Sequence, residues 1–136
     1  MNELSYTIKS HKIGRIYKAP HFFILNRGNN SGRPMNVPCP NCFVITTETE
    51  EMRESLFYLA LSLKEGRYFT YYLRGSVILF ITIDDTRKVI NTALRNYEQQ
   101  NWEFKVQKLK QITKFEENLK NRLTFVAHLK LALLRT

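Results

Sequence analysis

The sequence contains little cysteine and no long apolar segment, and each shortage excludes a class of protein. Its two cysteines are too few and too close together for the disulfide framework of a small secreted domain. No apolar run approaches the roughly 18 residues that a membrane-spanning helix needs. The opening residues, MNELSYTIKSHK, lack the apolar core of a signal peptide. We therefore expect a cytoplasmic protein that does not associate with membranes.

Acidic residues are scarce at both ends of the chain. Lys and Arg number 21 against 12 acids, which gives a net charge of +9. Residues 1–47 hold six Lys or Arg and one acid, residues 48–101 hold seven and eight, and residues 102–136 hold eight and three. This excess of positive charge points to an anionic partner, most often nucleic acid. A basic surface that is merely solvated has the same composition, so the charge alone does not decide.

The length and the apolar content predict one domain. With 136 residues, 43% of them hydrophobic, the chain can bury a modest core. We expect residues 1–136 to form a single domain, with a recognition-type core over 1–95 and a helical spacer or dimerisation segment over 96–136.

Runs of β-branched and aromatic residues predict about five strands. The expected strands are residues 4–9, 13–17, 21–25, 43–47 and 77–83. Residues 4–9 alternate apolar and polar side chains from Leu4 onward. Gly14 makes a turn or bulge an alternative for 13–17. The almost uninterrupted apolarity of VILFITI predicts that 77–83 is buried on both faces of a sheet.

Capping patterns and helical spacing predict three helices. Thr47 and Glu50 match a capping box before a helix over 48–65, and Asp84 or Asp85 should cap a second helix. Residues 102–134 read as one long helix without Gly or Pro. The predicted fold class is α+β: a mixed or antiparallel sheet of about five strands packed on helix 48–65, with a long C-terminal helix.

The loop NRGNNSGRP, which joins two predicted strands, is the strongest candidate for a binding site. Gly and Asn tolerate tight turns, and exposed N–H groups in such turns can form a nest for an anion. A solvent-exposed loop with two arginines is the simpler alternative. The candidate DNA-binding residues are the loop side chains and the cations that precede them: Arg27, Asn29, Asn30, Ser31, Arg33, Lys12, Arg15 and Lys18.

No catalytic or metal-binding constellation is legible, so we expect no enzyme and no cofactor. Cys39 and Cys42 form a single C-x-x-C without the second pair of ligands that zinc requires. The adjacent Asp84 and Asp85 are explained by helix capping. The aromatic residues between Arg67 and Arg74 could stack on nucleobases, although such runs more often enter a core.

The C-terminal helix is an expected interface. Its apolar residues recur every three or four positions, and lysines fill much of the rest. The helix could form a homodimer, dock on a larger subunit or lie along a phosphate backbone. The candidate interface residues are Leu109, Ile112, Leu119, Leu123 and Val126.

Three segments together resemble a target-recognition domain of type I restriction-modification specificity subunits. They are NRGNNSGRP followed by CFVITT, LRGSVILFITIDDTRKVI, and the terminal LKLALLRT, in the family's order over residues 21–136. The Pro-rich segment that follows the family's Asp-started helix is absent here. A small uncharacterised mobile-element family is an alternative resemblance. The first resemblance implies a domain that reads half of a bipartite DNA site, with helices that dock methyltransferase subunits.

These observations predict a non-catalytic module that contacts duplex DNA through a basic Gly/Asn-rich loop. The alternative is a protein-interaction module, an adaptor or inhibitor, that uses the amphipathic C-terminal helix.

Overall fold

The computed structural model describes residues 5–136 as an α+β protein with a four-stranded antiparallel sheet and a long C-terminal helix. It divides into two compact units, the first ending at Val106 and the second comprising Gln107–Thr136. Within residues 5–136, no helix combines the length and the apolarity that crossing a membrane requires.

The sheet has the strand order β1-β4-β2-β3, with every neighbouring pair antiparallel. The strands are β1 (Thr7–Ser10), β2 (His21–Leu25), β3 (Pro34–Met35) and β4 (Cys42–Thr46). The described residues thus form four strands, one fewer than the number expected. Strands β2 and β4 confirm the prediction, and β1 confirms the C-terminal part of segment 4–9, of which Leu4 lies outside the described residues.

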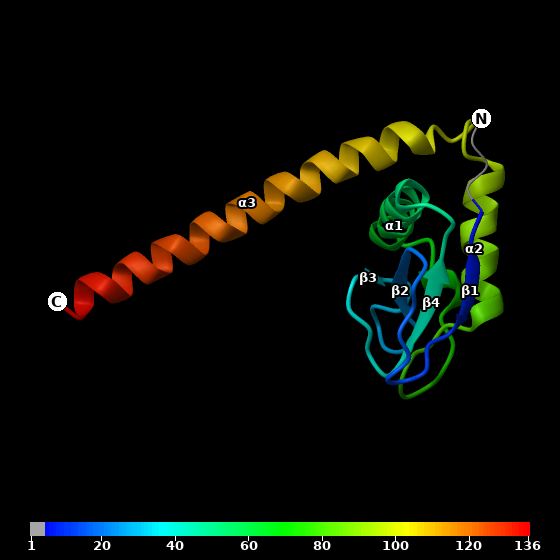
Figure 1. Cartoon of the computed structure of the whole chain (residues 1–136), viewed down its shortest axis with the longest axis horizontal. Helices are drawn as coiled ribbons and strands as arrows, with labels where there is room; N and C mark the ends of the chain where they lie inside the picture. Colours follow the sequence, from blue (N-terminus) through cyan, green and yellow to red (C-terminus); the bar gives the residue numbers. More distant parts are fainter. Residues whose placement is uncertain (1–4) are drawn as a thin grey trace. The chain divides into compact units, whose positions relative to one another are not determined.

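The core lies between one face of the sheet and two helices (Figure 1). Phe22 and Ile24 of β2 and Ile45 of β4 are fully buried on this face. Helices α1 (Glu50–Glu65) and α2 (Ile83–Arg95) cover it, whereas the sequence predicted α1 alone. Side chains alternate along strands, so Phe23 and Val44 point to the opposite face, which we call the second face.

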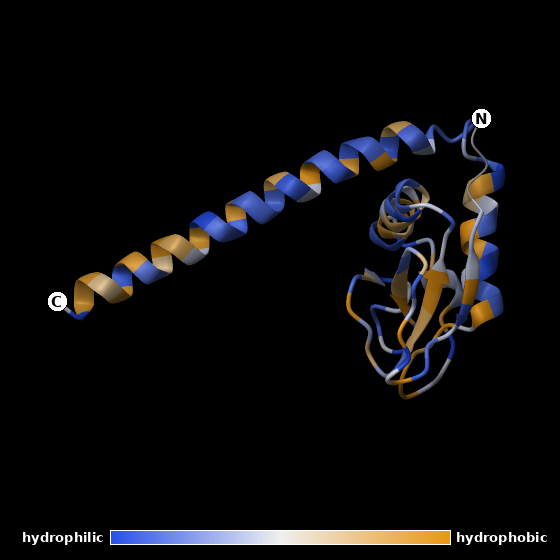
Figure 2. Cartoon of the chain, viewed as in Figure 1, coloured by the Kyte–Doolittle hydropathy of each residue, from blue (hydrophilic) through white to orange (hydrophobic). Residues whose placement is uncertain are grey.

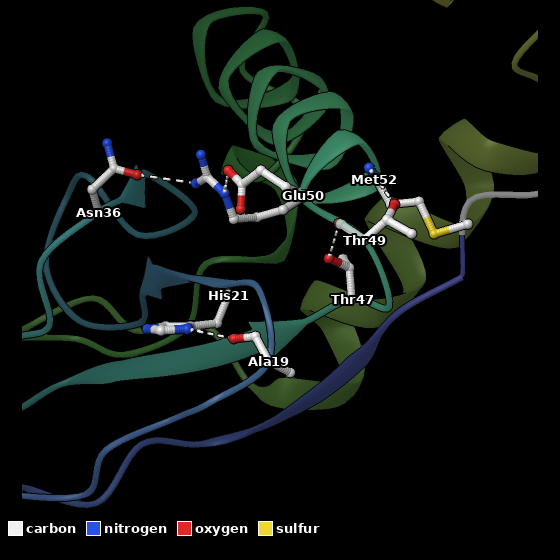
Figure 3. Close-up of polar contacts among 8 residues, drawn as sticks. Ala19, His21, Asn36, Thr47, Thr49, Glu50 and Met52 are labelled. Carbon is white, nitrogen blue, oxygen red and sulfur yellow. Dashed lines mark hydrogen bonds and ion pairs between the residues drawn. The ribbon is translucent and has the colours of Figure 1, made fainter.

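Threonine side chains begin both of these helices. Thr49 Oγ1 accepts a hydrogen bond from the Met52 N–H at 3.1 Å, and Thr47 donates to the Thr49 carbonyl (Figure 3). Thr82 caps α2 in the same way, by accepting from the Asp85 N–H. The predicted caps at Thr47 and at the aspartates are therefore wrong by two or three residues. The aspartates lie in the first turn of α2, where their negative charge interacts favourably with the positive end of the helix dipole.

Two predicted strands are not strands. Residues 13–14 form a turn, with Gly14 at φ +84°, as the alternative interpretation of that glycine allowed, and residues 15–17 have no regular secondary structure. Residues 77–80 form an exposed tip in which Val77 is 94% exposed, Ile81 is buried in the core, and α2 begins at Ile83. Isolated bridges from Phe80 to Arg27 and Arg74 connect this tip to the rest of the unit.

Helix α3 (Trp102–Leu134) begins in the first unit and supplies nearly all of the second. Trp102 and Val106 are buried in the core of the first unit. From Gln107 onward most side chains are exposed, and Figure 2 shows apolar residues concentrated in the last turns of the helix. An exposed apolar helix of this length is stabilised best by a partner.

Candidate nucleic-acid interface

One end of the sheet gathers most of the loops. Strands β1 and β2 end there, at Ser10 and Leu25, and β4 begins there at Cys42. The connections after β1 and β2 and the connection before β4 therefore meet at this end. The tip over residues 75–79 joins them, because the Gly28 N–H donates to the Leu79 carbonyl at 2.6 Å. We call this edge the loop end of the sheet.

The Gly/Asn-rich loop between β2 and β3 is a folded, hydrogen-bonded unit. Four of its backbone N–H groups donate to carbonyl oxygens within the first unit: Gly28 to Leu79, Ser31 to Gly28, Gly32 to Leu25 and Arg33 to Asn30. The side chain of Ser31 is buried and donates to the Gly28 carbonyl at 2.7 Å. These groups are not available to an anion, so the predicted nest does not form from them and Ser31 is not a DNA contact.

Two glycines permit the sharp turns of this loop and offer a test of its packing. Gly28 has φ +95° with open space around it, so Gly28→Ala is expected to cost about 1–2 kcal/mol of unfolding free energy. Gly32 has φ +100°, and an added Cβ would lie 2.4 Å from Cδ2 of the buried Phe69. We expect Gly32→Ala to cost at least about 1 kcal/mol more, as measured by urea denaturation. Equal losses would contradict this packing.

The other candidate residues are exposed, but they do not form one patch. Arg27, Asn29, Asn30 and Arg33 are exposed on the loop between β2 and β3. Lys12, Arg15 and Lys18 are exposed on segment 11–19, which leaves β1 at the loop end and returns to β2 at the other end of the sheet. Lys12 therefore lies near the loop end and Lys18 far from it.

Segment 11–19 crosses the second face of the sheet and is fixed there by aromatic contacts. The Tyr17 ring lies 6.1 Å from Phe23 and 5.4 Å from His21, centroid to centroid. A hydrogen bond of 2.9 Å joins the Tyr17 hydroxyl to His11 Nδ1, and His21 Nδ1 lies 2.8 Å from the Ala19 carbonyl (Figure 3). The cations of this segment are thus carried on an ordered support.

A small polar cavity of about 90 Å³ lies on this face beside β1. Lys9 and Arg15 line it together with hydroxyl groups from Thr7, Ser10 and Thr46, and no carboxylate from residues 5–136 lines it. The Thr7 and Thr46 hydroxyls contact each other. Lys9 was missed by the sequence reasoning, although the alternation along β1 placed it on the face opposite Ile8.

The sheet and its loops carry positive charge only. Residues 5–47 contain no Asp or Glu. Their cations are all exposed, and none forms an ion pair with a carboxylate among the described residues: Lys9, Lys12, Arg15, Lys18, Arg27 and Arg33. Three arginines outside this segment do form ion pairs: Arg53 with Glu50, Arg74 with Asp85 and Arg87 with Asp84. The surface over residues 5–47, which we call the basic surface, therefore has its charge available to an external anion.

An open cleft of about 710 Å³ adjoins the basic surface at the loop end. Arg27, Asn26 and Asn41 supply polar side chains to it, and the exposed tip supplies Val77 and Ile78. The apolar run that predicted a buried strand thus forms one wall of a groove. Cation and apolar side chains lie together in it.

The cysteines behave as structural thiols. Cys42 is buried, its Sγ donates to the Cys39 carbonyl at 3.1 Å, and burial raises the pKa of its thiol. Cys39 is only half-buried. We expect a disulfide reagent to label Cys39 faster than Cys42 by on the order of tenfold, because thiolate content and access decide the rate. Single Cys→Ser variants assign the two phases, and faster labelling of Cys42 would contradict this account.

Carboxylates are not gathered for chemistry in the part of the chain that the structure describes. No three His, Cys, Asp or Glu side chains come together among residues 5–136. Asp85 is buried and accepts hydrogen bonds from Arg74, and Asp84 pairs with Arg87. Both aspartates are accounted for by the first turn of α2 and its ion pairs.

Comparison with known proteins places most of the chain in one family. A family model described as "Family of unknown function (DUF6943)" matches residues 8–136. No curated protein and no solved structure is detectably similar to the chain. The family description assigns no activity, so the resemblance to target-recognition domains stays a prediction.

Proposed function

The chain belongs to the DUF6943 family of unknown function, and from its geometry we propose that it is a non-catalytic DNA-binding module. The observation that carries this proposal is the basic surface, which has six exposed cations and no acid over residues 5–47. Nucleic-acid affinity comes mainly from neutralising phosphates, and unpaired cations do this without first breaking an ion pair.

The position of each polar side chain indicates which part of the DNA it would contact. Arg27 and Arg33 lie on the ordered loop between β2 and β3, and Lys12 approaches the same end of the sheet. These side chains are suited to holding phosphates, while Asn29 and Asn30 offer amide groups to base edges. The resemblance to a single target-recognition domain supports the same assignment, because that family reads duplex DNA.

Fluorescence anisotropy with labelled random-sequence duplex DNA tests the proposal at low and near-physiological salt. We expect binding that weakens steeply as salt rises, because each phosphate contact releases bound counterions. A shallow salt dependence, or no binding at low salt despite the net charge of +9, would contradict it.

The alternative function, protein interaction through α3, is favoured by a separate observation. The predicted interface residues Ile112, Leu119, Leu123 and Val126 are exposed, whereas Leu109 is half-buried. Together with Phe115 and Leu129 they present an apolar seam to solvent. A second copy of the chain or a larger subunit would cover it. This function is compatible with DNA binding by the first unit.

A further inference from the structure

A third pocket, more enclosed than the open cleft, lies in the first unit, between the end of α1, the short 3₁₀ helix η1 (Thr70–Tyr72), α2 and the first turn of α3. Its volume is about 280 Å³, close to the lower limit of pockets that bind small molecules. Among the described residues, no charged side chain lines it. No residue of the basic surface lines this pocket, so the proposed DNA contacts do not account for it.

Aromatic rings form one side of this pocket. Tyr68, Tyr72 and Trp102 line it, and Leu63 and Val89 supply apolar surface. Tyr68 packs edge-to-face on Trp102 with ring centroids 5.5 Å apart. Trp102 is 4% exposed and Tyr68 48% exposed, and Tyr72 is half-buried, so the two tyrosine rings offer most of the surface on which a planar ligand can stack.

Three polar side chains lie on the side that α2 and the following turn provide. Thr92, Asn96 and Gln100 follow one another at four-residue steps. The Thr92 hydroxyl already donates to the Lys88 carbonyl. The side-chain amides of Asn96 and Gln100 make no hydrogen bond to any residue that the structure describes. Two amides beside aromatic rings can therefore donate to and accept from a ligand.

Lysine ammonium groups lie over two of the rings. Lys88 Nζ lies 5.8 Å from the centroid of the Tyr72 ring, and Lys105 Nζ lies 4.5 Å from that of Trp102. Neither lysine lines the pocket. Positive charge next to a neutral aromatic pocket suits a ligand whose flat ring carries a phosphate on a short arm.

We propose that this pocket binds a nucleobase, with the ring stacked on the aromatic side and its polar edge bonded by Asn96 and Gln100. A carboxamide presents one donor and one acceptor, which match the N6 and N7 atoms of adenine. The preferred ligand is therefore adenine, supplied either by a free nucleotide or by an unstacked base of a nucleic acid. This site is independent of the basic surface and does not rest on its proposed function.

Tryptophan fluorescence measures binding directly, because Trp102 is the only tryptophan of the chain. Titration of the full-length protein with adenosine is expected to change its emission in a saturable way, and cytidine is expected to bind more weakly. Adenosine has no phosphate, so its binding does not depend on the cations of the basic surface. Absence of a saturable change with any nucleoside would overturn the proposal.

Variants separate base recognition from folding. Asn96→Asp keeps the size of the side chain but removes the amide donor, and Gln100→Leu removes the second amide. Each is expected to weaken adenosine binding about tenfold. Gln99→Leu is the matched control, because Gln99 is exposed like Gln100 but lies outside the pocket, and this variant should bind normally. Unchanged binding in Asn96→Asp and Gln100→Leu would overturn the assignment of the amides.

The two sources of the base are distinguished by comparing adenosine monophosphate with single-stranded oligo(dA). Tighter binding of the mononucleotide identifies a free nucleotide. Tighter binding of the oligonucleotide identifies an unstacked base only if Asn96→Asp weakens it, because phosphate contacts with the basic surface do not involve this amide. A parent protein that binds duplex DNA but not adenosine contradicts only the nucleobase pocket. A parent protein that binds adenosine but not duplex DNA contradicts only the DNA-binding function of the basic surface.

Discussion

Replacing Lys12, Arg15, Arg27 and Arg33 together by alanine is expected to lower the affinity for duplex DNA on the order of 10³-fold near 0.1 M salt. The log–log salt dependence should become shallower by about 0.9 for each phosphate contact that is lost. These four cations are exposed and make no ion pair with a described carboxylate. Arg15 lies over the Tyr17 ring, 5.8 Å from its centroid, a contact worth about 0.5–1 kcal/mol at an exposed site. The loss should therefore fall mainly on binding and lower the unfolding transition only slightly.

A control variant with the same charge distinguishes local contacts from the general field of the protein. Replacing Arg53, Lys64, Arg87 and Arg95 by glutamine also removes four positive charges, from +9 to +5. These side chains lie on α1 and α2 and not on the sheet or its loops. We expect this variant to bind DNA within about tenfold of the parent protein. Equal losses in both variants would show that net charge, and not the basic surface, sets the affinity.

The strands and helices that could be predicted from the sequence are those that several independent sequence features indicate. β2 and β4 combine β-branched or aromatic residues with turn residues on either side, and α1 combines acids at its start with apolar residues at helical spacing. The tip 77–80 shows the limit of such reasoning. An apolar run has no intrinsic partner, and these residues find only isolated bridges at Arg27 and Arg74. Pairing is decided by the rest of the fold and not by the run itself.

Some features of the candidate sites could also be predicted from the sequence, and others could not. Exposure of Arg27 and Arg33 could be predicted from residue type, because isolated arginines in a polar loop are rarely buried. The burial of Ser31 could not, since it depends on how the loop closes on the Gly28 carbonyl. The aromatic pocket could not be predicted either. Its residues come from α1, η1, α2, α3 and the turns between them, so Asn96 and Gln100 line a pocket with Trp102 only once these elements are packed together.

Introducing aspartate at Leu119 and Val126 is expected to abolish self-association of the chain. Ile112, Leu119 and Val126 recur every seven residues, the repeat of a coiled-coil seam, and all are exposed. Burial of each such side chain contributes about 1.5–3 kcal/mol, so four replacements in a dimer should weaken it by more than about 10⁴-fold. Sedimentation velocity should find a dimer for the parent protein and a monomer for the variant.

Asn121→Asp with Thr124→Asp adds the same charge to α3 outside this seam and should leave the dimer intact. A parent protein that stays monomeric at high concentration would contradict self-association and would leave a larger subunit as the partner of α3.

The orientation of the two helices follows from Arg122, which takes the seam position three residues after Leu119. In a parallel dimer the two Arg122 side chains would face each other, and like charges at a buried seam are strongly unfavourable. In an antiparallel dimer the alignment that places Ile112 against Leu129, and Phe115 against Val126, sets Arg122 against Leu119 of the other copy. Glu116 of that copy then lies within about one helical turn of the guanidinium. Antiparallel pairing is therefore expected, and a single cysteine at Arg122 should crosslink to one at Leu119 of a second copy and not to itself.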